Sequence, residues 1–249
     1  MDRYYVGLDL GQSRDFTAIA VVERGLRTGA WDHVMYAWRK FATLELRYLE
    51  RMELGTPYPE VVERVVQVTR SGELKGRCYL AVDGTGVGRP VVDLLRRAQP
   101  NCVLMPAIIT GGDQETSGGG YSRIPKRDLI VQLQVLLQCG ALRIAAGLKD
   151  AGTLVAEMQA MRVKVTSAGH EQYGAWREGE HDDLVFAVAL ACWAAKKVQP
   201  NPPMGEDRWW RNEHFREAEA ALKNFTTETQ RTQRDGPGPG RRGYRRSSR

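Results

Sequence analysis

The sequence is poor in the residues that build disulfide frameworks and thiol or imidazole metal sites. Its 249 residues include only four cysteines and four histidines, and no two cysteines form a CxxC pair. We therefore expect neither a zinc site nor a disulfide framework, and reduced thiols in a cytosolic compartment fit this usage. The cysteines are scattered, each in an apolar neighbourhood, at Cys78, Cys102, Cys139 and Cys192.

A long hydrophobic run is also lacking. The longest nearly unbroken one covers residues 184–195, whereas a membrane span needs about 20 residues. The first residues carry charges and tyrosines where a signal peptide would need an apolar stretch. We therefore expect no membrane association.

The excess of positive over negative charge is confined to one part of the chain. The net charge is +6, and residues 231–249 contain seven arginines against one aspartate, so residues 1–230 sum to zero. This segment is polar and rich in Gly, Pro and Arg, which predicts a disordered tail over 226–249 and a polyanion as its partner. Residues 200–225 are expected to form a helical extension. The candidate DNA contacts in the tail are Arg241, Arg242, Arg245 and Arg246.

The pattern of apolar residues predicts an α/β fold that begins with a meander. Residues 4–10, 17–22 and 33–41 are β-prone and closely joined, which is typical of three antiparallel strands. Beyond residue 57, helical and extended patterns alternate, which predicts parallel strands joined by helices. The later elements expected are helices over 58–69, 89–98, 125–139, 148–162 and 182–197, strands over 77–82, 103–109 and 142–144, an extended segment over 173–176 and a glycine-rich loop over 111–120.

Three acidic positions share one context, at the end of an apolar strand or the start of an apolar helix. Asp9 and Asp83 each end a strand, and Asp182-Asp183 opens the last helix. A lone buried carboxylate is costly, so each must be paired, protonated or bound to a cation. If the strands of Asp9 and Asp83 are neighbours, their repulsion favours a divalent ion such as Mg²⁺ or Mn²⁺. The structural alternatives are a turn residue at Asp83 and a helix cap at Asp182.

These motifs, in this order, resemble the nuclease domain of tailed-bacteriophage terminase large subunits, which belongs to the ribonuclease H-like superfamily. The matching segments are 5–11, 81–83 and 179–185, and residues 124–144 also resemble a recurrent stretch of such domains. The resemblance implies a nuclease domain over residues 1–199. Its fold would be α/β and ribonuclease H-like, with a central mixed sheet of an antiparallel three-strand meander plus parallel strands, flanked by helices.

The resemblance further implies a metal-dependent endonuclease that cleaves double-stranded DNA with two Mg²⁺ or Mn²⁺ ions. Asp9 would bridge both ions, Asp83 would bind one, and Asp183 would complete the second site, with Asp182 as cap or auxiliary ligand. Asp15 is either a further ligand or a turn residue. Two such ions activate a water and stabilise the leaving oxygen, so no nucleophilic side chain or organic cofactor is needed.

Other residues carry alternative interpretations. Lys126 and Arg127 are candidate contacts for DNA phosphates, or else they form a solvated first helical turn. His181 is either a general acid–base group or, the favoured interpretation, a structural residue at a helix start. Trp209-Trp210 either stacks on nucleic acid or forms an apolar cluster that covers the domain.

A full large terminase also carries an ATPase motor, but its phosphate-binding pattern G-x-x-x-x-G-K-[ST] is absent here. The resemblance therefore implies the nuclease that cuts concatemeric viral DNA during genome packaging, either with the motor on a separate chain or as an isolated nuclease domain. The expected partners are double-stranded DNA, a terminase ATPase chain, the small terminase subunit and the portal protein. The expected location is the cytoplasm of a bacterial host, for a phage or prophage protein.

Three other functions remain open. A Holliday-junction resolvase of the same fold would need a dimer. A non-catalytic module that binds DNA or the portal would use its carboxylates for structure and its arginine tail for binding. The motifs at 9–11 and 83–86 also resemble phosphate motifs of actin-like ATPases and sugar kinases, although those proteins place a glycine-rich motif late in the chain, where this sequence has His181-Asp182-Asp183.

Overall fold

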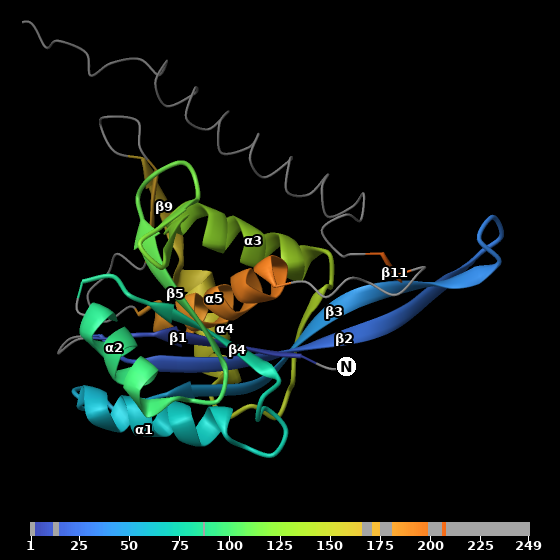
Figure 1. The fold of residues 1–249 in the computed structure, drawn as a ribbon. Helices are drawn as coiled ribbons and strands as arrows, with labels where there is room; N and C mark the ends of the chain where they lie inside the picture. Colours follow the sequence, from blue (N-terminus) through green and yellow to red (C-terminus); the bar gives the residue numbers. More distant parts are fainter. Residues whose placement is uncertain are drawn as a thin grey trace, which may run out of the picture.

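The computed structural model describes residues 3–11, 15–86, 88–165, 171–174, 181–198 and 206–207. A mixed β-sheet with helices on both faces forms its centre (Figure 1). In the described residues this sheet has nine strands in the order β11-β3-β2-β1-β4-β5-β7-β6, with β8 beside β3, while β9 and β10 form a separate antiparallel pair. The strands are β1 (Tyr4–Asp9), β2 (Ala18–Asp32), β3 (Ala37–Arg51), β4 (Cys78–Asp83), β5 (Val103–Thr110), β6 (Thr116–Gly118), β7 (Tyr121–Pro125), β8 (Leu142–Ile144), β9 (Arg162–Val165), β10 (Glu171–Gly174) and β11 (Glu206–Asp207). The helices are α1 (Tyr58–Thr69), α2 (Gly88–Ala98), α3 (Lys126–Gln138), α4 (Ala151–Ala160) and α5 (Asp183–Lys197).

The first three strands form an antiparallel meander, and later strands join it in parallel, which confirms the prediction from the sequence. β1 pairs with β2 on one side, where Asp9 faces Ala18, and with β4 on the other, where Leu8 faces Val82. β5 continues the sheet in parallel with β4, and β7 in parallel with β5. Because β1 and β4 run in the same direction, Asp9 and Asp83 lie at the same edge of the sheet.

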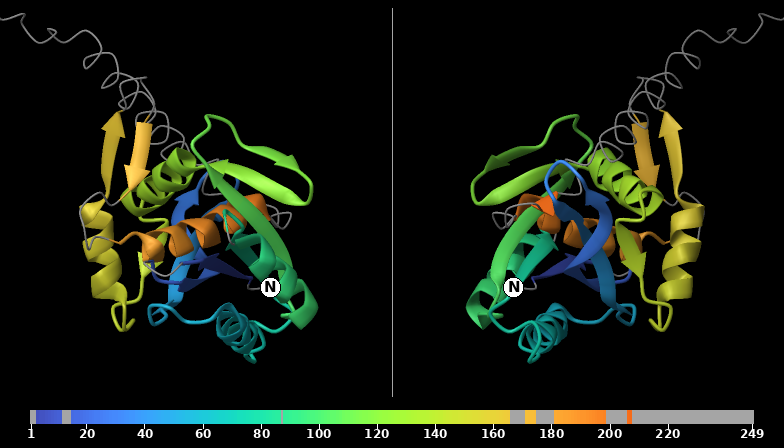
Figure 2. Two further views of the ribbon diagram at one scale, coloured as in Figure 1. Left: turned by 90° about the vertical axis from the view of Figure 1, so that its left-hand side faces the viewer. Right: turned by 90° about the vertical axis from the view of Figure 1, so that its right-hand side faces the viewer.

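Two helical layers enclose the sheet. Helices α3 and α5 pack on one face, and α1 and α2 pack on the other (Figures 1 and 2). Every residue of α5 from Asp183 to Ala195 is buried, which explains why its sequence is apolar all round. Gly7 of β1 lies directly beneath this helix, and a Cβ atom there would stand 1.9 Å from the carbonyl oxygen of Ala187. Only glycine permits this approach of helix to strand.

The hairpin of β2 and β3 is much longer than predicted. Strands were expected over 17–22 and 33–41, but β2 continues to Asp32, residues 33–36 form the turn, and β3 continues to Arg51. Beyond the core the two strands continue as a ribbon, residues 25–41, with β11 paired to it at Lys40 and Phe41 (Figure 1). Gly29 gives room to the ring of Phe41, which would lie 2.2 Å from a Cβ atom at that position. This glycine therefore serves strand pairing, whereas its residue type had favoured a turn.

The glycine-rich stretch 111–120 is also more ordered than a plain loop. Its second half contains β6, which pairs antiparallel with β7. Gly119 and Gly120 connect the two strands with φ values of +61° and +78°. These backbone angles suit glycine, so part of the glycine content belongs to a hairpin turn.

The predicted helices and the short strand over 142–144 are confirmed, with ends shifted by a few residues. Most of the predicted helical extension and the whole arginine tail lie outside the described residues, as do Trp209-Trp210 and the four candidate arginines of the tail. Among the helices described, none is long and apolar enough to cross a membrane. All four cysteines are free thiols.

Candidate metal centre at the ends of β1 and β4

Asp9 and Asp83 lie side by side because they end adjacent parallel strands, which are about 4.8 Å apart. The turn after β4 holds Asp83 in place. Its Oδ1 atom accepts hydrogen bonds from the backbone N–H (2.9 Å) and the hydroxyl (2.5 Å) of Thr85. Thr85 Oγ1 in turn accepts a hydrogen bond of 3.0 Å from the N–H of Ile109. Asp83 is therefore a turn residue as well as a neighbour of Asp9.

Helix α5 brings two more carboxyl groups to this edge. Asp183 is only 4% exposed. Asp182 occupies the N-cap position, but its side chain makes no capping hydrogen bond. Its Oδ2 atom instead lies 3.4 Å from Nζ of Lys126, which also stands 4.3 Å from the ring centroid of Phe186. Asp182 therefore stands at the expected N-cap position but does not cap the helix with its side chain.

The negative charges of the neighbouring carboxyl groups act on the pKa of Asp9. Burial raises the pKa of Asp9 well above its usual range, and the negative charges of Asp83, Asp183 and Asp182 raise it further. Burial raises the pKa of Asp83 as well, against the hydrogen bonds that it accepts. Like charges repel strongly where water is excluded, so a cation bound among these carboxyl groups would reduce their repulsion.

Asp183 experiences the same repulsion from a different side. Burial raises its pKa to about 6; the charge of Arg51 opposes this rise, while those of Asp182 and Asp15 add to it. Asp15 is exposed and precedes β2, so its influence on Asp183 places it near the site. His181 also lies here, with Nδ1 3.8 Å from Oδ2 of Asp183.

Arg127 has a different environment from its neighbour Lys126. Its guanidinium lies 3.6 Å from Asp113 and 3.5 Å from Asp128, and it donates a hydrogen bond to the carbonyl oxygen of Asp113. The structure thus brings Lys126 to the carboxyl groups of the site, whereas Arg127 contacts the segment before β6.

Two residues of the site, Arg51 and Glu157, were not predicted from the sequence. Glu157 of α4 is 5% exposed and forms an ion pair with Arg51, which ends β3. Nη2 of Arg51 also lies 3.7 Å from Oδ2 of Asp183. Glu157 is the only acidic residue between Asp150 and Glu171, so a lone acid in an amphipathic helix was the available signal. Arg51 lies among alternating charges and carries no such signal.

These residues fit a hard divalent cation. The buried Oδ2 atom of Asp183 has no hydrogen-bond partner among the described residues, although buried polar atoms are normally paired. A donor set of carboxylate oxygens suits Mg²⁺ or Mn²⁺. In the part of the chain described, no three His, Cys, Asp or Glu side chains already stand in metal-binding geometry. The cations of Lys126 and Arg51 lie against Asp182 and Asp183 instead.

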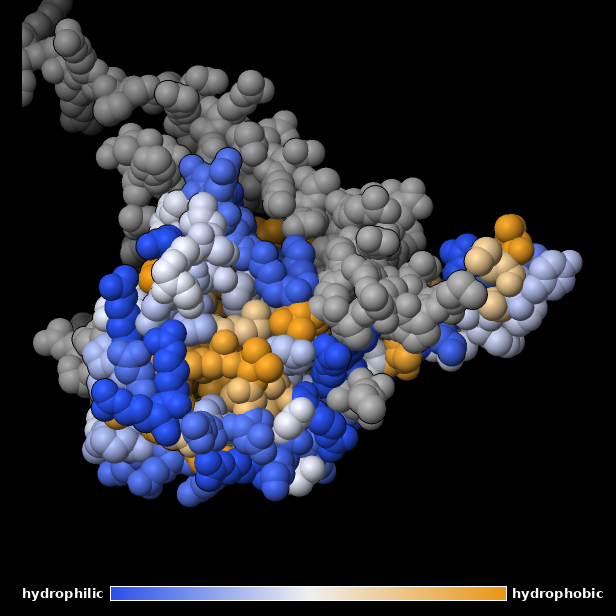
Figure 3. All heavy atoms as spheres, viewed as in Figure 1, coloured by the Kyte–Doolittle hydropathy of each residue, from blue (hydrophilic) through white to orange (hydrophobic). Residues whose placement is uncertain are grey.

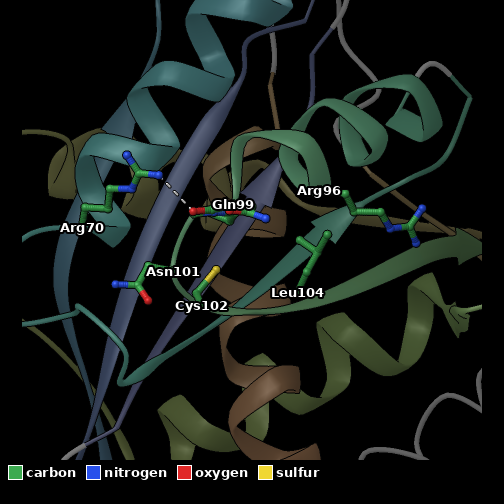
Figure 4. Close-up of a pocket in the computed structure, with 7 residues that line it drawn as sticks. Arg70, Arg96, Gln99, Asn101, Cys102 and Leu104 are labelled. Atoms are coloured by element: carbon green, nitrogen blue, oxygen red, sulfur yellow. Dashed lines mark hydrogen bonds between the residues drawn. The ribbon is translucent and has the colours of Figure 1, made fainter.

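A pocket of about 530 Å³ lies at the opposite edge of the sheet, where β5 begins (Figure 4). Arg70 donates hydrogen bonds of 3.1 Å to the carbonyl oxygens of Ala98 and Gln99. Arg96 is paired with Asp93 at 2.8 Å. Since both arginines are engaged and its lining residues include no carboxylate, this pocket is separate from the candidate metal centre. It is lined by Arg70, Arg96, Gln99, Pro100, Asn101, Cys102 and Leu104.

The arrangement of the sheet and helices is also found in solved structures of large terminase nucleases. The large terminase nuclease from thermophilic phage G20c is 21% identical, with a TM-score of 0.50 over 76% of this chain and 81% of that one. Structures of the same nuclease with bound magnesium and with bound cobalt are each 23% identical, with TM-scores of 0.51 over 77% of this chain and 81% of theirs. No protein-family model matches the sequence, and no curated protein matches it. The fold class expected from the sequence is thus confirmed.

Proposed function

We propose that this protein is a metal-dependent endodeoxyribonuclease of the large-terminase kind. The observation that carries the proposal is the convergence of Asp9, Asp83 and Asp183 from two adjacent strands and one helix, with Asp9 and Asp183 strained by mutual repulsion. The shared fold of the phage G20c nuclease, which was solved with magnesium and with cobalt, supports it.

Each carboxylate has a role in this proposal. Asp9 would contribute to holding two Mg²⁺ or Mn²⁺ ions, Asp83 would hold one, and Asp183 would hold the other with Asp182 beside it. Asp15 is an auxiliary ligand. When bound, such ions activate a water and stabilise the leaving 3′-oxygen of the phosphodiester. The work of the chain is to hold these oxygens together at one edge of the sheet, with Asp83 fixed by its turn and Asp183 by the first turn of α5.

The wider role follows from the same resemblance. Lys126, Arg127 and the tail residues Arg241, Arg242, Arg245 and Arg246 would contact the phosphates of double-stranded DNA. The substrate would be concatemeric viral DNA during genome packaging in the cytoplasm of a bacterial host. A separate terminase ATPase chain would supply the motor, and the small terminase subunit and the portal protein would be further partners.

The test is cleavage of plasmid DNA by the wild type and by Asp9→Asn, each with Mn²⁺, Mg²⁺ or EDTA. We expect the wild type to cleave only with metal and Asp9→Asn to show no cleavage above background, because asparagine keeps the shape and removes the charge that holds the ions. Asp93→Asn is the matched control, since Asp93 is exposed on α2 and pairs with Arg96 far from the site.

Other results would redirect the proposal. Metal-dependent cleavage that survives Asp9→Asn would remove these carboxylates from the reaction. A folded wild type that cleaves under none of these conditions would favour a binding module, or a nuclease that acts only with its motor partner.

A further inference from the structure

We propose that Glu157 is a positioning residue that sets the geometry of Asp183, an inference that rests on the proposed function. Glu157 belongs to α4 and comes from outside the set of carboxylates at the strand ends. It is nearly fully buried, yet both of its oxygens are directed at parts of the site. Its two oxygens contact different groups, which explains the presence of a carboxylate at this buried position.

The first oxygen holds the start of α5. Oε2 of Glu157 accepts hydrogen bonds from the backbone N–H groups of Leu184 (3.0 Å) and Val185 (3.2 Å). The first N–H groups of a helix have no partner within the helix, and Asp182 does not cap them with its side chain. A residue of another helix therefore fixes the first turn of α5, and Asp183 is part of that turn.

The second oxygen limits how closely Arg51 approaches Asp183. Oε1 of Glu157 pairs with Arg51, whose guanidinium also lies 4.7 Å from the ring centroid of Phe16. The backbone N–H of Arg51 donates to Oδ2 of Asp150 at 3.3 Å, which anchors the end of β3. In this position Nη2 of Arg51 remains 3.7 Å from Oδ2 of Asp183, too far for a hydrogen bond.

Removing the charge of Glu157 changes this balance. Among the described ion pairs of Arg51, the remaining carboxylate partner is that of Asp183. We expect the guanidinium to move onto Asp183, where it competes with a metal ion for the same oxygen. The start of α5 loosens at the same time, so both effects weaken metal binding. Residues that orient metal ligands typically change metal affinity by about 10–100-fold when replaced.

The experiment measures Mn²⁺ binding by the full chain, using the electron paramagnetic resonance signal of free Mn²⁺ and without DNA. Glu157→Gln is the main variant, because its single carbonyl oxygen can serve either the N–H groups of α5 or Arg51, but not both. We expect its Kd for Mn²⁺ to rise about tenfold. Glu157→Ala tests the complete loss of the contact. Leu154→Ala is the matched control, since Leu154 is buried in the same helix but has neither a charge nor a side-chain hydrogen bond.

Plasmid cleavage against Mn²⁺ concentration supplies the second measurement. We expect the Glu157→Gln curve to shift to higher Mn²⁺ and to reach nearly the wild-type rate at saturation. If Glu157→Gln binds Mn²⁺ within twofold of the wild type, or no more weakly than Leu154→Ala, the positioning role is rejected. If the wild type itself binds no Mn²⁺, the proposed function fails first, which separates the two conclusions.

Discussion

The two ends of the central strands differ in which side chains they bury and which they expose. Where β1 and β4 end, carboxyl groups are withdrawn from water and repel one another, with Asp183 only 4% exposed. At the other end the ribbon leaves apolar side chains in water, with Val34 87% exposed and Tyr36 81% exposed. Figure 3 shows a small hydrophobic patch at the end of the ribbon, beside hydrophilic residues.

This difference separates what stabilises the fold from what serves a function. Burying several like charges opposes folding, so a chain that retains them must gain something by their charge. The ribbon is the reverse case, because its aromatic residues contribute little burial to the core. We call Asp9, Asp83, Asp182 and Asp183 the carboxylate cluster. Substitutions at the carboxylate cluster and its partners should therefore change stability and metal binding together, whereas substitutions at the ribbon should change neither by much.

The largest effect is expected from Arg51→Met. This change leaves Glu157 buried without its partner and removes a cation whose charge lowers the pKa of Asp183. Breaking a buried pair in this way costs about 3–5 kcal/mol. Urea unfolding in EDTA measures the loss, and Mn²⁺ should restore part of it by supplying the missing positive charge.

Arg47→Met is the matched control for that experiment. Arg47 lies on the same strand, but it is exposed and pairs with Glu23 and Glu45 at the surface. Such pairs contribute about 0–1 kcal/mol. If Arg51→Met lowers the free energy of unfolding no more than Arg47→Met does, buried charge pairs do not stabilise the carboxylate cluster.

A smaller effect is expected from pH in the metal-free protein. In the unfolded chain an aspartate ionises near pH 4, whereas in the folded protein the pKa of Asp183 is about 6 and that of Asp9 is also raised. Between these values the folded state binds more protons than the unfolded state, so stability falls as pH rises. Thermal melts in EDTA should therefore show Tm falling from pH 5 to pH 8.

Saturating Mn²⁺ should reverse this trend, because the ion binds the ionised carboxylates. A Tm in EDTA that rises over the same interval would contradict the assigned repulsion. As a control, Asp9→Asn in EDTA should show a weaker fall than the wild type, since it removes one of the groups whose pKa is raised.

The carboxylate cluster was more predictable from the sequence than the ribbon. Asp9 and Asp83 each end an apolar strand, which made both candidate ligands. The alternation of helix and strand predicted parallel pairing beyond residue 57, whereas the parallel pairing of β1 with β4 is seen only in the structure. Arg51 and Glu157 were missed because their pairing joins β3 to α4, across 106 residues, and neither local pattern encodes it. The ribbon was missed because its strands gain their order from each other, while their residues, such as Gly25 and Gly29, favour a turn.

The smallest effect is expected from Trp38→Ser on the ribbon. Trp38 packs edge-to-face on Trp31 with 5.5 Å between ring centroids, yet it is 56% exposed. Such a pair contributes about 0.5–1.5 kcal/mol, and solvent exposure places this one at the lower end. At about 2–4 °C per kcal/mol, Tm should fall by only a few degrees. Mn²⁺ affinity and plasmid cleavage should remain as in the wild type, since Trp38 lies at the far end of β3 from Arg51. A Trp38→Ser variant that folds but binds Mn²⁺ more weakly would mean that the ribbon and the carboxylate cluster are coupled through β3. The claim that the two regions are energetically independent would then be wrong.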